Sequence, residues 1–443
     1  MDDNANYLKA VRNQYEGYPY PPRVPEDERH RRLRTGLCEL PQLNHYGHAG
    51  RQGFEGYHAL VAGGGTGDAT VFLAEQLHER GGRVVHLDLS TASMEVAKQR
   101  CAVRGLTNVE WVHGSLLDLP QMGLGPFDHI NCCGVLHHLA DPDQGLAALR
   151  AVLRDDGSMG IMLYGRYARE GVYQMQALLR LLNQGETDMD ACVRTARATL
   201  GAVPASNWYK FGEKLFSDVW KFGDPGIYDL LLHSQDRAYT VPQLYDYVEK
   251  QGMRLVAFGR PLDRMWLTPG FSIREPRLLQ RLNNLPERDR QAAMEIFTGT
   301  AIKHSFYVSP RTDSVASLDD LDNVPFLYGF AGDDPNRVIA DFFQKAKGKG
   351  VTLKDQDFSY PVQPQAHSHH ILRHMDGTRT TAEIFEAVRA ATGDQRLTDP
   401  VLLKDFRPVY EQFNQVDHML LRHKTARPLP PLRQQIPGDG GEG

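Results

Sequence analysis

Residues 59–70 read ALVAGGGTGDAT, and this stretch decides the fold of the 443-residue chain. The apolar residues before Gly63 predict a buried strand, the glycines at positions 63, 64, 65 and 67 predict a tight turn, and Asp68 opens an expected helix. Glycine lets the backbone turn and approach a bound molecule where a side chain would collide. The free N–H groups and the positive dipole end of the helix would face that molecule. The stretch therefore predicts a ligand-binding turn.

Short apolar runs alternate with longer amphipathic runs from His58 to Gly165, which is typical of βαβ units around a parallel sheet. The five strands expected here are 58–62, 83–89, 109–114, 127–134 and 158–165. Helices are expected at 69–80, 91–104 and 143–153, where apolar residues recur three and four positions apart. A helix at 240–252 and strands at 255–258 and 304–309 would complete the same sheet.

The glycine spacing is G-x-G-x-G, and Asp68 stands where a dinucleotide-binding dehydrogenase has its third glycine. Asp88 closes the second expected strand, and Phe127-Asp128 opens a strand followed by the tetrapeptide LHHL at 136–139. Together these motifs resemble the class I S-adenosylmethionine-dependent methyltransferases, over roughly residues 58–165. The resemblance implies S-adenosyl-L-methionine as the cofactor, a methyl-transfer reaction and a seven-stranded Rossmann-like sheet.

The resemblance also implies which residues bind the cofactor. The glycine turn would wrap the nucleoside, and the carboxylate of Asp88, with Leu89 beside it, would hold the ribose hydroxyls. Cys132, Cys133 and Gly134 at the end of the fourth strand would lie beneath the methionine part. Ser115 stands where the family usually has the Asp that contacts the adenine amino group, with Asp118 as the runner-up and the backbone of Leu116 as a further contact. The full cofactor set is Gly63, Gly64, Gly65, Gly67, Asp88, Leu89, Ser115, Leu116, Cys132, Cys133 and Gly134.

Methyl transfer from a sulfonium is an in-line displacement, so the protein mainly has to position the acceptor and exclude water. A base is needed only where the acceptor must lose a proton, and no sequence motif is obligatory. The candidates for the acceptor side are Tyr18, Tyr20, His137, Tyr164 and His233. The polar segment from His233 to Tyr239 either faces the cleft or caps a helix, and both interpretations stay open.

The expected fold class is α/β, with a helical insertion after the fifth strand and a smaller, mostly helical, winged-helix-like domain at the C-terminus. The latter is indicated by a helix, an Asp-Gly turn and a second helix in which Thr380 and Glu383 form a capping box. The expected division is an N-terminal arm with the YPYPPR segment (1–50), a catalytic domain (51–310, insertion about 166–235), a linker (311–325), the C-terminal domain (326–427) and a disordered tail (428–443).

Composition limits the partners. Lys and Arg number 50 against 55 Asp and Glu, so no overall positive field gathers phosphates, and nucleic acid is not the expected partner. The five cysteines fit no disulfide framework, and no stretch has the length of a membrane span, so we expect a cytoplasmic protein without a membrane partner. The histidines at 367–374 lack a completing ligand set, so no metal is expected. The basic run at 29–34 is interpreted as a solvated helix face.

Three functions are compatible with these patterns. The arrangement of arm, catalytic core and appended domain resembles a bacterial multi-domain methyltransferase group whose extra domain is sometimes called regulatory, and this favours a nitrogen or oxygen acceptor on a protein or peptide side chain. A small-molecule metabolite is the first alternative. A non-catalytic S-adenosylmethionine-binding regulatory protein is the second. The sequence leaves the oligomeric state open.

Overall fold

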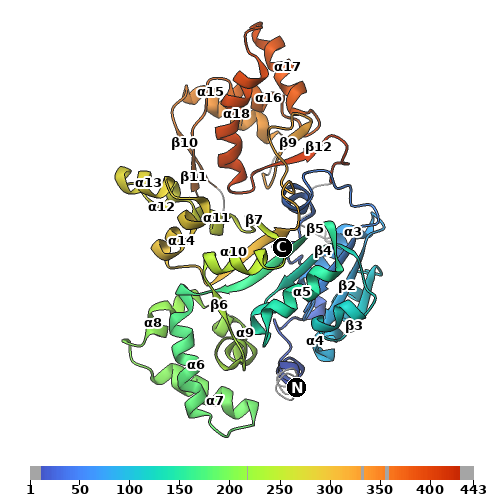
Figure 1. Ribbon diagram of the computed structural model, residues 1–443, viewed down its shortest axis with the longest axis vertical. Helices are drawn as coiled ribbons and strands as arrows, with labels where there is room; N and C mark the ends of the chain where they lie inside the picture. Colours follow the sequence, from blue (N-terminus) through green and yellow to red (C-terminus); the bar gives the residue numbers. More distant parts are fainter. Residues whose placement is uncertain (1–10, 217, 331–333, 355–358, 430–443) are drawn as a thin grey trace.

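The computed structural model describes residues 11–216, 218–330, 334–354 and 359–429. Its central sheet has eight strands: seven follow the order β3-β2-β1-β4-β5-β8-β7, and the short β6 pairs with the end of β5 (Figure 1). The strands are β1 His58–Ala62, β2 Arg83–Asp88, β3 Val109–His113, β4 Phe127–Cys133, β5 Leu153–Gly165, β6 Ala238–Tyr239, β7 Arg254–Phe258 and β8 Lys303–Ser309. The predicted seven-stranded Rossmann-like sheet is confirmed.

The register explains where a ligand can approach this sheet. β1 runs parallel to both β2 and β4, with Leu60 opposite Val85 on one side and Ile130 on the other. β8 is antiparallel and lies between β5 and β7, so that Phe306 faces Ile161 across the β5–β8 pair. The carboxyl ends of the five parallel strands therefore meet at one edge, which is where open α/β sheets bind their ligands.

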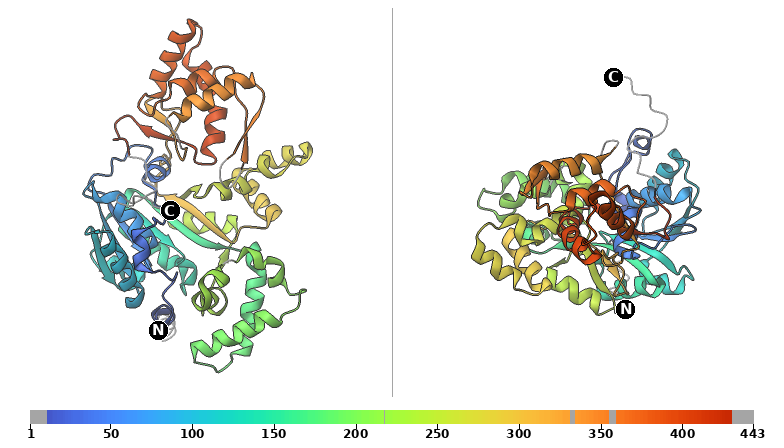
Figure 2. Two further views of the ribbon diagram at one scale, coloured as in Figure 1. Left: turned by 180° about the vertical axis from the view of Figure 1, so that it is seen from behind. Right: turned by 90° about the horizontal axis from the view of Figure 1, so that it is seen from above.

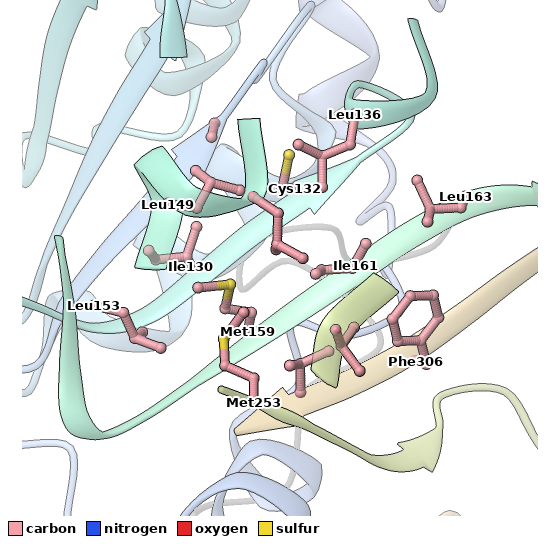
Figure 3. Close-up of a cluster of buried hydrophobic side chains, with 14 of the residues drawn as sticks. Ile130, Cys132, Leu136, Leu149, Leu153, Met159, Ile161, Leu163, Met253 and Phe306 are labelled. Carbon is pink, nitrogen blue, oxygen red and sulfur yellow. The ribbon is translucent and has the colours of Figure 1, made fainter. Parts of the chain in front are cut away.

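Helices cover both faces of the sheet. On one face, α5 (Pro142–Val152) and α10 (Val241–Glu249) bury the largest apolar cluster, part of which Figure 3 shows between β4, β5 and β8. On the other face lie α3 (Asp68–His78), α4 (Thr91–Val103), α2 (Leu40–Gln42) and the turn η2 (Leu43–Gly47). Leu40, Leu43 and Tyr46 pack with Phe72 of α3 and with Tyr307 of β8, so the end of the N-terminal arm belongs to the core of the sheet.

The segment between β5 and β6 is helical, as predicted for the insertion. It contains α6 (Glu170–Leu182), α7 (Met189–Ala202), α8 (Trp208–Gly212), α9 (Asp218–Ile227) and η7 (Tyr228–Leu232), drawn in green at the bottom of Figure 1. Val172, Met175 and Leu179 on α6 pack against Val193 of α7 and Tyr209 of α8, which gives the insertion an apolar core of its own.

A second helical segment, which the sequence analysis did not predict, separates β7 from β8. Its four helices are α11 (Pro261–Leu267), α12 (Pro269–Ser272), α13 (Pro276–Asn283) and α14 (Glu287–Thr298). The first three begin with Pro at N1 or N2, and Pro286 occupies the N-cap of α14. Proline fits the first turn of a helix because its missing N–H has no partner there.

The C-terminal region forms a smaller helical module at the top of Figure 1 and of the left view in Figure 2. It consists of α15 (Pro335–Ala346), the hairpin β10 (Val351–Lys354) and β11 (Ser359–Val362), then α16 (Ser368–His374), α17 (Thr381–Thr392) and α18 (Asp399–Asn414), while β9 (Asn323–Leu327) pairs with β12 (Met419–His423). The capping box of Thr380 and Glu383 starts α17 as expected. The segment interpreted as a linker contributes buried Ala316 and Leu318 to the module's core, so it packs rather than loops freely.

A buried aspartate joins this module to the sheet. Asp417 accepts hydrogen bonds from Tyr46 Oη at 2.6 Å and Gln42 Nε2 at 2.8 Å, and Arg264 of α11 lies 2.6 Å from the same carboxylate.

Among the described helices, none combines the length and apolarity needed to cross a bilayer. All five cysteines are unpaired. Residues 430–443, most of the segment expected as a disordered tail, lie outside the described residues.

Four buried histidines make the fold sensitive to acid. Burial lowers the pKa of His48 to about 4 and those of His45, His86 and His129 to about 3. Below pH 6.5 the unfolded chain therefore binds more protons than the folded chain, and the free energy of unfolding falls by roughly 1 kcal/mol per pH unit for each histidine. We expect the urea midpoint to drop between pH 7 and pH 5. An unchanged midpoint over that range would contradict the assignment of these side chains as neutral.

Candidate active site

The glycine turn joins β1 to α3 with three residues in the left-handed region. The φ angles are 70° at Gly63, 52° at Gly65 and 95° at Gly67. A Cβ at position 65 would lie 2.9 Å from the carbonyl oxygen of Tyr20, because the N-terminal arm crosses the turn there. The turn therefore needs glycine both for its conformation and for the close approach of the arm.

Asp88 ties the end of β2 to this turn. Its Oδ2 accepts a hydrogen bond from the backbone N–H of Gly65 at 2.7 Å, and its Oδ1 accepts one from the N–H of Ser90 at 2.8 Å. Asp88 is 9 % exposed, and burial raises the pKa of its carboxyl group from the ordinary value. Each carboxylate oxygen can still accept a further hydrogen bond, so the group can hold two neighbouring hydroxyls of a ligand.

A cavity of about 420 Å³ lies along the carboxyl ends of the parallel strands, within the size range of small-molecule sites. Nine of the eleven residues expected to contact the cofactor line it: Gly63, Gly64, Gly65, Asp88, Leu89, Ser115, Leu116, Cys133 and Gly134. The structure thus brings these residues together around one space. Asp118, the runner-up to Ser115, is exposed and does not line the cavity.

Gly67 and Cys132 are the two expected cofactor residues that the structure places elsewhere. A Cβ at position 67 would come within 2.7 Å of the Cβ of Ala97, so this glycine allows α3 to begin close against α4. Cys132 is fully buried in the apolar cluster below α5, as Figure 3 shows. Side chains alternate along a strand, and it is Asn131 and Cys133 on β4 that face the cavity.

The expected acceptor-side residues divide in the same way. Tyr20 and Tyr164 line the cavity, whereas Tyr18, His137 and His233 do not. The hydroxyl of Tyr18 donates a hydrogen bond to Asp190, and its ring packs on Tyr228 in the insertion. His137 is fully buried with its ring centroid 3.9 Å from that of Tyr164, and His233 stacks at 3.7 Å behind His138. These two histidines support the cavity wall without reaching its surface.

Several cavity residues with polar or charged groups were not among the predicted site residues, including Tyr15, Arg169, Asp229 and Lys303. Asp229 of the insertion is the centre of this group, because it accepts hydrogen bonds from Tyr15 Oη at 3.3 Å and from Tyr164 Oη at 3.5 Å. The three residues come from the arm, from the end of β5 and from η7. The sequence has no local spacing pattern that predicts a contact among these three residues.

Arg169 fixes the position of Tyr164. Its guanidinium carbon lies 3.6 Å from the centroid of the tyrosine ring, and its Nη2 is 2.8 Å from Asp236. The side chains of Arg169 and Asp236 are 3 % and 0 % exposed, and the pKa of Arg169 is raised by the charge of Asp236 against the effect of its burial. The cation–π contact and the ion pair together hold the tyrosine hydroxyl at the cavity.

The N-terminal arm is fastened over the glycine turn by a network of charges. Arg23 donates to both oxygens of Asp68, at 2.8 and 2.6 Å, and Thr66 Oγ1 donates to the carbonyl of Pro21 at 2.7 Å. Arg100 on α4 donates to Glu28 at 2.9 and 2.6 Å and also to Asp68 at 2.7 Å. The basic run is therefore not simply a solvated helix face, because Glu28 beside it is buried and Arg32 within it pairs with Glu75.

Comparison with known proteins agrees with the geometry. A family model described as a methyltransferase domain matches residues 60–159. Uncharacterized protein syc1184_c from Synechococcus is 30% identical over 399 residues, 85% of this chain and 88% of that protein. PKMT2 from Rickettsia typhi, solved in complex with AdoHcy, has a TM-score of 0.56 at 14% identity over 87% of this chain and 76% of that one. Ubiquinone biosynthesis O-methyltransferase from Acinetobacter baylyi is 26% identical over 150 residues, 33% of this chain and 60% of that protein.

Fold, motifs and family match define a class I S-adenosylmethionine-dependent methyltransferase, and its cofactor is S-adenosyl-L-methionine. The chain belongs to this family, and 85% of its length aligns with the Synechococcus protein at 30% identity. The protein is an enzyme of the transferase class and not a non-catalytic regulator.

The contacts of Asp88 predict how much this residue contributes to cofactor affinity. Asp88→Ala removes a charged acceptor from the cavity, and hydrogen bonds to charged groups contribute about 1.5–3 kcal/mol each. We expect the affinity for AdoHcy, measured by calorimetry, to fall roughly 100-fold for two lost bonds. Asp118→Ala should bind AdoHcy as the wild type does. An unchanged affinity in Asp88→Ala would remove this carboxylate from the site.

The arm network predicts an unequal effect of two neighbouring glutamates. Glu28→Gln leaves the buried Arg100 and Arg104 against a neutral group, and breaking a buried pair costs about 3–5 kcal/mol. Glu26→Gln disrupts only the exposed pair with Arg29, so its effect should stay below about 1 kcal/mol. Urea unfolding of both variants measures the difference. Equal stability of the two would show that the network does not fasten the arm.

Proposed function

We propose that the cofactor lies along the carboxyl edge of the sheet, with its ribose on Asp88, its adenine near Ser115 and Leu116, and its methionine part over Cys133 and Gly134. The support is that these groups line one continuous cavity. Bound there, the sulfonium supplies an electrophilic methyl group. The protein positions it through backbone N–H groups and one buried carboxylate, and the arm limits the access of water.

We propose further that the methyl acceptor is a nitrogen or an oxygen. At the insertion side of the cavity, Asp229 lies between the hydroxyls of Tyr15 and Tyr164. A buried carboxylate accepts hydrogen bonds, so this end suits a group that carries an N–H or O–H. Aromatic rings and a carboxylate both attract a positive charge, so this end of the cavity also favours an acceptor group that is cationic until it loses its proton.

Apolar side chains outside the cavity favour a protein or peptide as the carrier of that group. Trp208 and Phe211 on α8 are 61 % and 76 % exposed, and Leu215, which follows them, is 40 % exposed and also lines the cavity. Contiguous exposed apolar groups mark interaction sites. Because Leu215 is both exposed and part of the cavity lining, this arrangement suits an acceptor larger than the cavity itself. A small metabolite is the competing acceptor and would need the cavity alone.

A transfer assay separates these acceptors. Tritiated S-adenosylmethionine and the enzyme are added to a lysate of the organism that makes the protein, and the lysate is then fractionated by size. We expect label in polypeptides, and a mass spectrum of the labelled species identifies the atom. Asp118→Ala protein should transfer label as the wild type does, and Asp88→Ala protein should transfer much less at a limiting concentration of S-adenosylmethionine. Label confined to the small-molecule fraction would replace the proposed acceptor by a metabolite.

A further inference from the structure

One side chain of the cavity has the geometry of a base. His138 follows β4, in the short helix η4 (Leu136–His138), and it lines the cavity near Tyr164, with ring centroids 5.6 Å apart at 85°. The ring nitrogens of His137, and Nε2 of His233, are buried and bond no described group. Of these three clustered histidines, His138 is thus the one that borders the ligand space.

The carbonyl of Gln235 and the ring of His233 hold the orientation of the His138 ring. Nδ1 lies 2.8 Å from the carbonyl oxygen of Gln235. A carbonyl only accepts, so Nδ1 must carry the proton and Nε2 of the neutral ring keeps its lone pair. His233 stacks on the His138 ring, with the ring centroids 3.7 Å apart and the planes 20° from parallel, and this contact favours the observed orientation of the ring. The segment Gln235–Asp236, just before β6, therefore selects the tautomer of His138 that carries its proton on Nδ1.

The charges around His138 allow it to be neutral near pH 7. Burial lowers its pKa first, and the guanidinium of Arg169 acts in the same direction. The carboxylate of Asp236 and the carbonyl of Gln235 oppose this decrease. The other groups packed on the ring are His137, His233 and Tyr164, and burial keeps both of those histidines uncharged as well. A neutral imidazole is ready to take a proton.

We propose that His138 is the general base of the methyl transfer and that the carbonyl of Gln235 sets its tautomer. This inference rests on the proposed function, because it places the acceptor beside Tyr164. Asp229 is the weaker candidate for the base, since both of its oxygens already accept tyrosine hydroxyls. Those hydrogen bonds fit a carboxylate that positions the acceptor.

The step balances without any further reactant. The lone pair of the acceptor atom forms a bond to the methyl carbon, the bond between sulfur and that carbon breaks with its electron pair moving to sulfur, and the thioether product is neutral. The proton on the acceptor atom moves to Nε2 of His138. The positive charge thus passes from the sulfonium to an imidazolium, which later releases its proton to solvent. General-base assistance of this kind contributes about 10²–10⁴-fold.

The variant His138→Asn tests the proposal, because its amide can still donate to Gln235 while the basic nitrogen is gone. The assay uses tritiated S-adenosylmethionine with the lysate fraction that the wild type labels. We expect kcat to fall about 100-fold, AdoHcy affinity to stay within about threefold, and the loss of rate that the wild type shows at acidic pH to disappear. Free imidazole should restore rate to His138→Ala and leave the wild type unaffected.

Each other outcome has a definite meaning. A wild type that binds no AdoHcy refutes the proposed function itself. Normal AdoHcy binding with undiminished kcat in His138→Asn, or a reduced kcat that keeps the acidic loss of rate and gains nothing from imidazole, overturns the role of His138 alone. If both variants fail to fold, nitrogen NMR of histidine-labelled wild type with AdoHcy decides, since a proton on Nε2 at pH 7 excludes the base.

Discussion

The guanidinium of Arg100 is the contact on which the architecture of the site depends. It is 1 % exposed and touches the arm through Glu28, the start of α3 through Asp68 and the glycine turn through the carbonyl of Thr66. A buried charge without partners is strongly unfavourable, so α4, the turn and the arm cannot separate at this point without that cost. The cavity consequently has a composite wall, with its floor on the sheet, one side on the insertion and its cover on the arm.

The parallel part of the fold could be predicted because each strand carries its own signal. Expected and observed bounds of β1 coincide, and those of β2, β3 and β4 differ by one residue at the carboxyl end. Of the four helices between β7 and β8, α11 and α12 are short, and α13 and α14 are rich in polar residues and bury few side chains, so no apolar run marked them. The prolines that begin them, such as Pro261 and Pro276, were the available signal.

The residues of the candidate site likewise divide into those with a local sequence signal and those without one. Residues at the strand ends, such as Asp88 and Ser115, could be placed because motif spacing fixes their position on the sheet. The alternation of side chains along β4 distinguishes Cys133, which faces the cavity, from Cys132, which faces the apolar cluster. Asp229 and Tyr15 could not be found, because they meet only through the packing of an insertion and an arm that are 214 residues apart in sequence.

The crossing of the arm over the turn restricts how this sequence can vary. At φ 52°, asparagine or aspartate could adopt the backbone conformation of Gly65 in a chain whose turn is open to solvent. Here the carbonyl of Tyr20 occupies the space that any Cβ would need. Position 65 and the path of residues 20–21 are therefore coupled, and a homologue that loses the arm also loses the steric reason for glycine at that position.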